Sequence, residues 1–223
     1  LNSIYKFYLF IGKNTINTYL KSKYNKKDFC IISSNCWAGH LYQALGKKYN
    51  TPFVGLFINA EDYINLLSNF DYLMKQELKI KLKSKYKSLH IYYPIGVLPG
   101  DIEIHFMHYK SEAEALEKWN KRKNRMIKDK NQIFVKFDDR DFCEDYHIEK
   151  FHKLNFKNKI SFTKKKYNFT ENIKLKNSKD LILLYSTVGL FDIPKWLNTG
   201  KITNSFINKL ITKLFPYPKS WTH

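Results

Sequence analysis

Cysteine is scarce in this sequence of 223 residues, which contains only Cys30, Cys36 and Cys143. None of the three has the paired spacing of a zinc site or of a secreted disulfide framework. The sequence therefore predicts a protein that folds without metal or disulfide cross-links, in a reducing compartment. We expect it to be cytoplasmic.

Long apolar runs are also lacking, because no stretch approaches the roughly 20 consecutive apolar residues that cross a bilayer. The opening residues, LNSIYKFYLFIGKN, include a short apolar run with no small-residue cleavage site, so we expect neither a signal peptide nor a transmembrane helix. We expect residues 1–27 to form a helical extension that docks on the core, with contact at the inner face of the membrane as the alternative. One face of that helix would carry Ile4, Tyr5, Tyr8, Leu9 and Gly12.

Acidic residues are few, 20 against 39 basic ones, which gives a formal net charge of +19. Such a charge suggests an anionic partner, for example nucleic acid, anionic lipid or a phosphorylated substrate. Arginine is rare, however, and proteins that read bases rely heavily on it. We therefore expect that nucleic acid is not the partner, and that most of the lysines form a solvated surface.

Short β-branched and aromatic runs alternate with segments of helical spacing along the chain. We predict strands at 28–34, 51–58, 88–93, 101–109, 132–137, 159–163 and 180–188, and helices at 35–45, 60–70, 112–128 and 144–154, followed by helix and loop from 195 to 223. This order predicts an α/β fold with a mainly parallel sheet flanked by helices on both faces, a three-layer α/β/α arrangement. We expect residues 28–223 to form a single domain.

The first candidate site follows the strand predicted at 28–34, since ligands of open α/β sheets bind beyond the carboxyl ends of strands. Cys36 would lie in the first turn of the next helix, where the helix dipole favours a thiolate or a bound anion. His40, four residues later, would share its face, so the two could form a nucleophile pair for acyl transfer or line a phosphate cradle. Alternatively, both side chains are simply packed in the core. The neighbouring residues expected to bind substrate are Ser34, Asn35 and Gly39.

The second candidate site is the acidic turn after the strand at 132–137. Asp138, Asp139 and Asp141 would repel one another in a dry core, so they need a metal, a basic partner or water. Such oxygen ligands suit Mg²⁺ or Mn²⁺ holding the diphosphate of a nucleotide sugar. The alternative is that these aspartates serve the turn and the helix cap. Arg140, between them, is a candidate substrate-binding residue.

Further candidates lie on the strand predicted at 101–109 and on the helix after it. Glu103 and His105 would share a face of the strand, so Glu103 could orient His105 as an acid/base pair near neutral pH. The alternative is an ordinary polar contact. His108 and Arg122 are candidate substrate-binding residues, although Arg122 could equally remain solvated.

Several of these motifs together resemble a bacterial family, the domain of unknown function family 1919, which is often labelled exopolysaccharide biosynthesis protein. The resemblance covers roughly residues 28 to 200 and is carried by ISSNCWAGHLYQ (32–43), NTPFVGLF (50–57), GDIEIHFMHY (100–109), WNKR (119–122) and VKFDDRD (135–141). It implies a sugar-polymer setting and an α/β fold, and supplies no reaction or catalytic residues.

The Asn35-Cys36 step is similar to the Asn-Cys start of a capsule-biosynthesis acyltransferase-like family that binds coenzyme A. This sequence departs from that family at Ser34, where the family has glycine, and at Trp37, where it has glutamine. Ala38 stands where members of family 1919 often have glycine, which bears on the backbone freedom of the loop.

These observations predict an enzyme of exopolysaccharide or capsule biosynthesis that transfers an acyl or glycosyl group to a sugar or lipid-linked sugar. The donor would be a coenzyme A thioester, or a nucleotide sugar with Mg²⁺ or Mn²⁺. The alternative is a non-catalytic module that binds anionic glycan or a membrane surface through lysines. The enzyme hypothesis requires the Asn35-Cys36 turn and the acidic turn to meet at one edge of the sheet.

Overall fold

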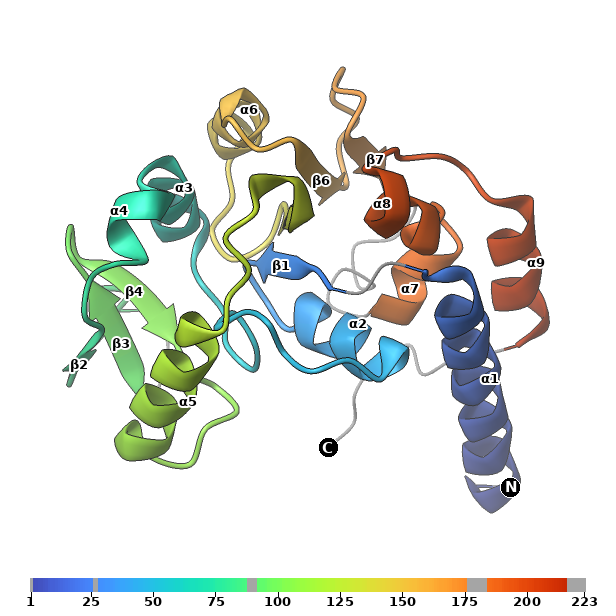
Figure 1. The fold of residues 1–223 in the computed structure, drawn as a ribbon, viewed down its shortest axis with the longest axis horizontal. Helices are drawn as coiled ribbons and strands as arrows, with labels where there is room; N and C mark the ends of the chain where they lie inside the picture. The colour runs from blue at the N-terminus through green and yellow to red at the C-terminus, as the bar shows by residue number, and fades with distance from the viewer. Residues whose placement is uncertain (1, 26–27, 88–91, 176–183, 216–223) are drawn as a thin grey trace.

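The computed structural model describes residues 2–25, 28–87, 92–175 and 184–215. Its main sheet has four strands in the order β1-β5-β6-β7, and every neighbouring pair is parallel (Figure 1). The bounds are Cys30–Ser33 for β1, Ile133–Asp138 for β5, Asn158–Thr163 for β6 and Asn172–Lys174 for β7. The short β-branched and aromatic runs form these strands because both faces of a parallel sheet are covered.

Side chains that alternate along the strands fill two separate cores, one on each face of the sheet. Val135 and Phe137 pack with residues of α3 (Ala60–Ser68) and α6 (Asp145–Lys153). Phe134 and Phe162 pack on the other face with α2 (Trp37–Leu45), α7 (Leu184–Val188) and α8 (Ile193–Thr199). The predicted α/β fold, with a parallel sheet between two layers of helices, is therefore confirmed.

A second, antiparallel sheet extends the first core, with the order β2-β3-β4. It comprises Lys79–Lys81, Ile95–Leu98 and Ile102–His105, and lies with α5 (Glu112–Asn124) at the opposite end of the molecule from α1 and α9 (Figure 1). The strand predicted at 101–109 is therefore shorter than expected and antiparallel. The remaining short helices are α4 (Phe70–Leu73) and η1 (Lys130–Gln132).

The strand predicted at 51–58 is wrong. This segment follows an irregular path with left-handed backbone at Gly55, φ 72°, and forms only an isolated bridge between Phe57 and His105. It nevertheless joins the two sheets, because the Ile58 amide donates to the Ser34 carbonyl at 2.9 Å while Phe57 pairs with His105. An apolar run can thus be buried as a connector rather than as a strand.

Other predicted elements differ in extent. Ser111 caps α5 by accepting from the Glu114 amide at 3.2 Å, and the helix ends at Asn124 rather than 128. In the strand predicted at 180–188, residues 184–188 form helix α7 instead, and 180–183 lie outside the described residues. The strand predicted at 88–93 also lies mostly outside them. Helices predicted at 35–45, 60–70 and 144–154 correspond to α2, to α3 with the start of α4, and to α6.

Only the second half of helix α1 (Asn2–Lys23) docks on the protein, and that half is part of the domain core rather than a separate layer. Ile16 and Leu20 are fully buried in the core beside α2 and α8. Ile4, Tyr5 and Tyr8, expected on the docked face, are exposed instead, because the first half extends past the body of the molecule (Figure 1). Among the described residues, no helix has the length and apolar character needed to cross a bilayer.

Candidate functional site

The two predicted turns meet at the carboxyl edge of the parallel sheet. β1 and β5 are neighbours, so the residues after Ser33 and after Phe137 emerge on the same side. The Asn35 amide Nδ2 donates to Asp138 Oδ2 at 2.7 Å across 103 residues of sequence. The predicted convergence of the Asn35-Cys36 turn with the acidic turn is confirmed.

A buried lysine organises this meeting point. Lys136, on the same face of β5 as Asp138, is 0% exposed and donates to Asn35 Oδ1 at 3.2 Å and to the Asp138 carboxylate. Its ammonium also lies 5.9 Å from the centroid of the Phe162 ring. Burial lowers the pKa of Lys136, and the Asp138 carboxylate opposes that change. We name the three residues Asn35, Lys136 and Asp138 the buried cluster.

The buried cluster leaves hydrogen-bonding capacity unused. Within the part of the chain that the structure describes, Asp138 Oδ1 and the hydroxyl oxygen of Ser34 have no hydrogen-bond partner, although both atoms are buried. Buried polar atoms are normally paired, so these two atoms can accept or donate a hydrogen bond to a water molecule or a ligand at the strand end. Ser34 and Asn35, both predicted to bind substrate, are thus placed at this edge.

The acidic turn after β5 has an unusual backbone. Asp141 and Phe142 both adopt left-handed conformations, with φ of 54° and 62°, which side-chain-bearing residues rarely do. The Asp141 carbonyl accepts from the Ala60 amide at 2.9 Å, which ties the turn to the first residue of α3. This strained geometry fixes where the Asp141 side chain lies.

Asp141 is the acid of this turn best suited to proton transfer. Its side chain is 20% exposed, and Arg140 Nη2 lies 3.8 Å from its Oδ1. Burial, reinforced by the charge of Asp138, raises the pKa of Asp141 to about 6, while Arg140 and Lys136 oppose the rise. The Asp141 carboxyl therefore titrates near neutral pH, where a general acid or base is most effective.

The predicted metal ligands do not converge. Asp138 pairs with Lys136, and Asp139 Oδ2 accepts from the Lys164 amide at 2.6 Å. Among the described residues, no group of three or more His, Cys, Asp or Glu side chains is arranged to hold a metal ion. The Mg²⁺ or Mn²⁺ prediction therefore gains no support from the arrangement of these residues.

Cys36 is placed at the meeting point but is poorly set up as a nucleophile. It is the N-cap of α2 rather than a first-turn residue, and its Sγ lies 4.0 Å from the Leu56 carbonyl. Only 8% of the residue is exposed, and burial raises the pKa of its thiol to about 11, with Lys136 and Arg140 opposing the rise. The thiol is consequently protonated at neutral pH.

His40 and Gly39 are held by packing on the next turn of α2. Burial lowers the pKa of His40 to about 4, and the charges of His108 and Lys13 lower it further. His40 is therefore neutral at pH 7, and its electrostatic neighbours include His108. A Cβ on Gly39 would lie 3.0 Å from the Val54 side chain, so this glycine permits the close approach of the 51–58 segment.

Glu103 and His105 do form the predicted pair, on β4 of the antiparallel sheet. His105 Nε2 lies 3.4 Å from Glu103 Oε2, and the His105 ring stacks on Phe57 at 4.5 Å between centroids. Burial lowers the pKa of His105 to about 4, which leaves it neutral. Glu103 accepts from Lys81 at 2.7 Å and from the Ser84 hydroxyl at 2.5 Å, so it anchors the antiparallel sheet.

Arg122 also has a structural environment. It donates to Tyr109 Oη at 2.5 Å and to the Val54 carbonyl at 3.3 Å, and its guanidinium lies 5.0 Å from the Tyr49 ring centroid. These contacts fasten α5 to the 51–58 segment. Among the two arginines predicted to bind substrate, only Arg140 lies at the edge of the main sheet.

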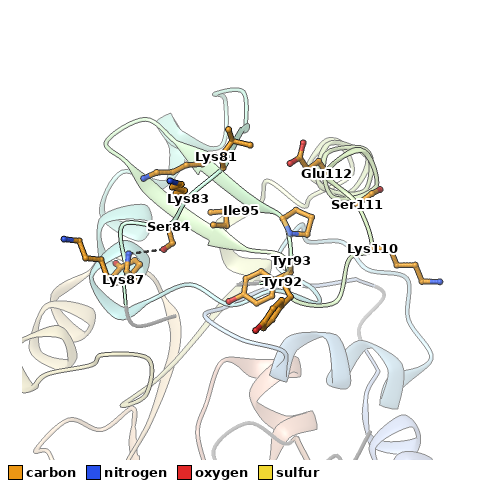
Figure 2. Close-up of a pocket in the computed structure, with 13 residues that line it drawn as sticks. Lys81, Lys83, Ser84, Lys87, Tyr92, Tyr93, Ile95, Lys110, Ser111 and Glu112 are labelled. Carbon is orange, nitrogen blue, oxygen red and sulfur yellow. Dashed lines mark hydrogen bonds between the residues drawn. The ribbon is translucent and has the colours of Figure 1, made fainter. Parts of the chain in front are cut away.

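Sequence reasoning missed a pocket of about 570 Å³ between the β2–β3 region and the N-terminus of α5 (Figure 2). Lysines and tyrosines dominate its wall: Lys81, Lys83, Lys87, Lys110, Tyr86, Tyr92 and Tyr93. We name this the lysine–tyrosine pocket. Neither Lys83 nor Lys87 forms an ion pair with any carboxylate of the described chain. The available sequence signals were the lysine-rich stretch at 75–87 and the Tyr92-Tyr93 pair.

The lysine–tyrosine pocket borders the acidic turn. The Tyr86 ring stacks on Phe142, with centroids 5.7 Å apart and ring planes 5° from parallel. Burial raises the pKa of Tyr93, and the Asp141 charge raises it further, which shows that these two side chains are electrostatic neighbours. The lysine–tyrosine pocket therefore lies next to the carboxyl group whose pKa burial raises to about 6.

Comparison with known proteins places this arrangement in a family. A protein of Haemophilus influenzae (strain Rd), described only as an uncharacterized protein, is 39% identical over 152 residues, which is 68% of this chain and 69% of that protein. Residues 8–198 match the family described as Domain of unknown function (DUF1919), which covers both turns and the lysine–tyrosine pocket. The chain belongs to the DUF1919 family.

Proposed function

We propose that this protein is a cytoplasmic transferase of bacterial exopolysaccharide or capsule assembly, which moves an acyl or glycosyl group from a nucleotide-bearing donor to a sugar or lipid-linked sugar. One observation carries the proposal: the strained turn after β5 places the Asp141 carboxyl beside Arg140 at the carboxyl edge of the parallel sheet, where burial raises its pKa to about 6. A carboxylate with this pKa is mostly ionised at pH 7 and still basic enough to accept a proton from an attacking hydroxyl.

The step would transfer the group straight to the acceptor, without a covalent enzyme intermediate, and at a thioester carbonyl it would pass through a tetrahedral oxyanion that then expels the thiolate. The acceptor hydroxyl oxygen bonds to the anomeric carbon of a nucleotide sugar, or to the carbonyl carbon of a coenzyme A thioester, while its proton passes to Asp141. The bond to the donor breaks, and the nucleoside diphosphate or coenzyme A leaves with the electron pair. Arg140 would balance the negative charge of the phosphates or of the oxyanion. A protonated Cys36 thiol favours this route over a covalent intermediate on cysteine.

The lysine–tyrosine pocket supports a nucleotide-bearing donor. Its volume of about 570 Å³ lies within the range of small-molecule sites. Lys83 and Lys87 supply unpaired positive charge for phosphates, and Tyr86, Tyr92 and Tyr93 supply flat faces for a base or sugar ring. Both proposed donors, a nucleotide sugar and coenzyme A, share phosphates next to a ring system.

Two further observations support the setting. The resemblance of the quoted motifs to proteins labelled exopolysaccharide biosynthesis supports the polysaccharide context. The cytoplasmic location is supported by the cysteines, because Cys30, Cys36 and Cys143 are all free thiols.

Thermal unfolding in the presence of UDP-glucose, coenzyme A or unphosphorylated glucose tests donor binding. We expect one nucleotide-bearing compound to raise the melting temperature by roughly 5–10 °C at about 100 times its Kd, and glucose to have no effect. Lys83→Gln/Lys87→Gln should abolish that rise, while the matched control Lys121→Gln/Lys128→Gln on and after α5 should retain it. Absence of any rise, or an equal rise in the pocket variant, would refute the donor site.

Asp141→Asn tests the chemistry separately from binding. The variant should keep the donor-induced rise in melting temperature and lose release of the nucleotide in the presence of acceptor sugars. The unpaired Lys83 and Lys87 also favour a second candidate, a non-catalytic module that binds anionic glycan. That module predicts glycan binding without donor turnover, and Asp141→Asn would not change it.

A further inference from the structure

Two helices at one end of the molecule carry most of the large apolar side chains that are exposed in the described residues. On the first half of α1 the exposed residues are Ile4, Tyr5, Phe7, Tyr8, Phe10 and Ile11. On α9 (Phe206–Leu214) they are Phe206, Ile207, Leu210 and Leu214. Ile4 is 75% exposed and Phe206 is 79% exposed. Single exposed apolar residues are common, but this many on two helices at one end of the molecule mark an interaction surface.

Helix α9 turns a polar side toward the core and exposes most of its large apolar side chains. Its buried residue is Asn208, whose Nδ2 donates to the Phe191 carbonyl at 2.9 Å. Thr212 lies on the same inner side, close to Gly189, where a Cβ would approach its hydroxyl oxygen to 2.6 Å. Phe206, Leu210 and Leu214 follow helical spacing on the outer side. The strongly apolar face of this helix is therefore turned away from its own protein.

Helices α1 and α9 contact each other near the second half of α1. The hydroxyl of Ser205, which caps α9, is hydrogen bonded to Tyr19 of α1. Figure 1 shows both helices at the same end of the molecule, with the first half of α1 extending past the body. We name the first half of α1 together with the outer face of α9 the apolar end.

The charge around the apolar end identifies its partner. Neither α1 nor α9 contains an aspartate or glutamate, whereas they carry Lys6, Lys13, Lys21, Lys23, Lys209 and Lys213. Aromatic and aliphatic side chains flanked by lysines, without acids, are typical of helices that lie in the interface of an anionic membrane. Tyrosine in particular favours the level of the lipid headgroups.

We propose that the apolar end is a membrane-contact surface, which inserts its aromatic and aliphatic side chains into the interface of an anionic bilayer while its lysines bind the headgroups. The inference stands on α1 and α9 alone and does not depend on the transferase chemistry. A second copy of the chain is the competing occupant, but it would bring together two surfaces of the same positive sign.

Flotation of the full chain with lipid vesicles tests this proposal. We expect the protein to float with vesicles of phosphatidylcholine mixed with phosphatidylglycerol, and to remain unbound with pure phosphatidylcholine. Phe7→Glu/Phe10→Glu on α1 and Phe206→Glu/Leu210→Glu on α9 should each reduce binding at least tenfold. The matched control Tyr72→Glu/Met107→Glu adds the same charge at exposed apolar residues elsewhere and should bind as the unmodified chain does.

The lysines give a second comparison. Lys6→Gln/Lys209→Gln should weaken binding roughly 30-fold, from about 1 kcal/mol for each lysine near an anionic surface. Lys121→Gln/Lys128→Gln removes the same charge outside the apolar end and should have little effect. Failure of the unmodified chain to float, or equal binding by both pairs of variants, would overturn the proposal. So would light scattering showing a lipid-free dimer that Phe7→Glu/Phe10→Glu converts to monomer, because a second copy would then cover this surface.

Discussion

Replacing Lys136 with methionine should destabilise the protein far more than an ordinary surface substitution. Methionine matches the length of the lysine stem but removes the ammonium that bonds to Asn35 and to Asp138. The Asp138 carboxylate would then be left charged and unpaired in a site where it is 1% exposed. Breaking one partner of a buried pair typically costs about 3–5 kcal/mol of unfolding free energy.

For a chain of this length, that loss corresponds to a fall in melting temperature of roughly 6–20 °C. Urea unfolding followed by the fluorescence of the buried tryptophans, among them Trp37 and Trp196, provides the free energy. The double variant Lys136→Met/Asp138→Asn removes both charges, and the neutral amide can still bond to Asn35. We expect it to recover at least about 2 kcal/mol relative to Lys136→Met alone.

The exposed pair of Lys130 and Asp71, 3.0 Å apart, is the matched control. Lys130→Met should change the unfolding free energy by less than about 0.5 kcal/mol, because solvent screens this pair. If Lys136→Met is as mild as Lys130→Met, or if the double variant recovers nothing, the buried cluster is not the charge-paired unit inferred from its geometry.

Three further predictions concern stability. Burial raises the pKa of Asp141 from 3.8 to about 6, so between these pH values the carboxyl is protonated in the folded state and ionised in the unfolded state. The stability contributed by the protonated carboxyl is therefore lost as the pH rises from about 4 to 6. Asp141→Asn should therefore raise the unfolding free energy at pH 8 by up to ~3 kcal/mol, and an unchanged pH profile would contradict this. Burial lowers the pKa of both His40 and His105 to about 4, so the stability that their neutral rings contribute is fully present above pH 6.5 and is lost as the pH falls toward 4. Acid titration followed by circular dichroism should show unfolding between these pH values, and His40→Gln should reduce this acid sensitivity. Gly200→Ala should lower the melting temperature more than Gly100→Ala, although both glycines have left-handed backbone. Only at Gly200 would the new Cβ clash with a side-chain oxygen, that of Asn158. Equal falls in melting temperature would rule out that clash.

The central sheet was predictable because its strands are local patterns. The β-branched and aromatic runs at 28–34, 132–137 and 159–163 can be buried on two faces only in a parallel sheet between helices. The segment at 51–58 has the same composition, yet it forms no strand. Its path depends on the left-handed backbone of Gly55 and on contacts with Gly39 of α2 and Arg122 of α5, which both lie outside the segment. Composition shows that such a run is buried, but not which neighbours it meets.

The sequence predicted the location of the candidate site better than the roles of its residues. Loops that follow adjacent parallel strands emerge at one edge, so the meeting of Asn35 with Asp138 follows from topology. The state of Cys36 depends instead on how deeply the 51–58 segment covers it, and the helix-start argument for a thiolate does not include that burial. The lysine–tyrosine pocket is built from β2, β3 and the start of α5, and no local pattern in the sequence indicates that these elements enclose a space.

The strained turn at Asp141 and Phe142 provides the strongest structural reason to regard this edge as a working site. Two consecutive left-handed residues that carry side chains cost roughly 1–2 kcal/mol each, and glycine would adopt the same backbone without that cost. The hydrogen bond from the Ala60 amide to the Asp141 carbonyl requires the backbone shape but not the side chain. Folding alone would therefore favour glycine at Asp141, and it would also favour removing a carboxyl whose pKa burial raises to about 6. A position that costs stability both in its backbone and in its charge is best explained by what its carboxylate does for a ligand.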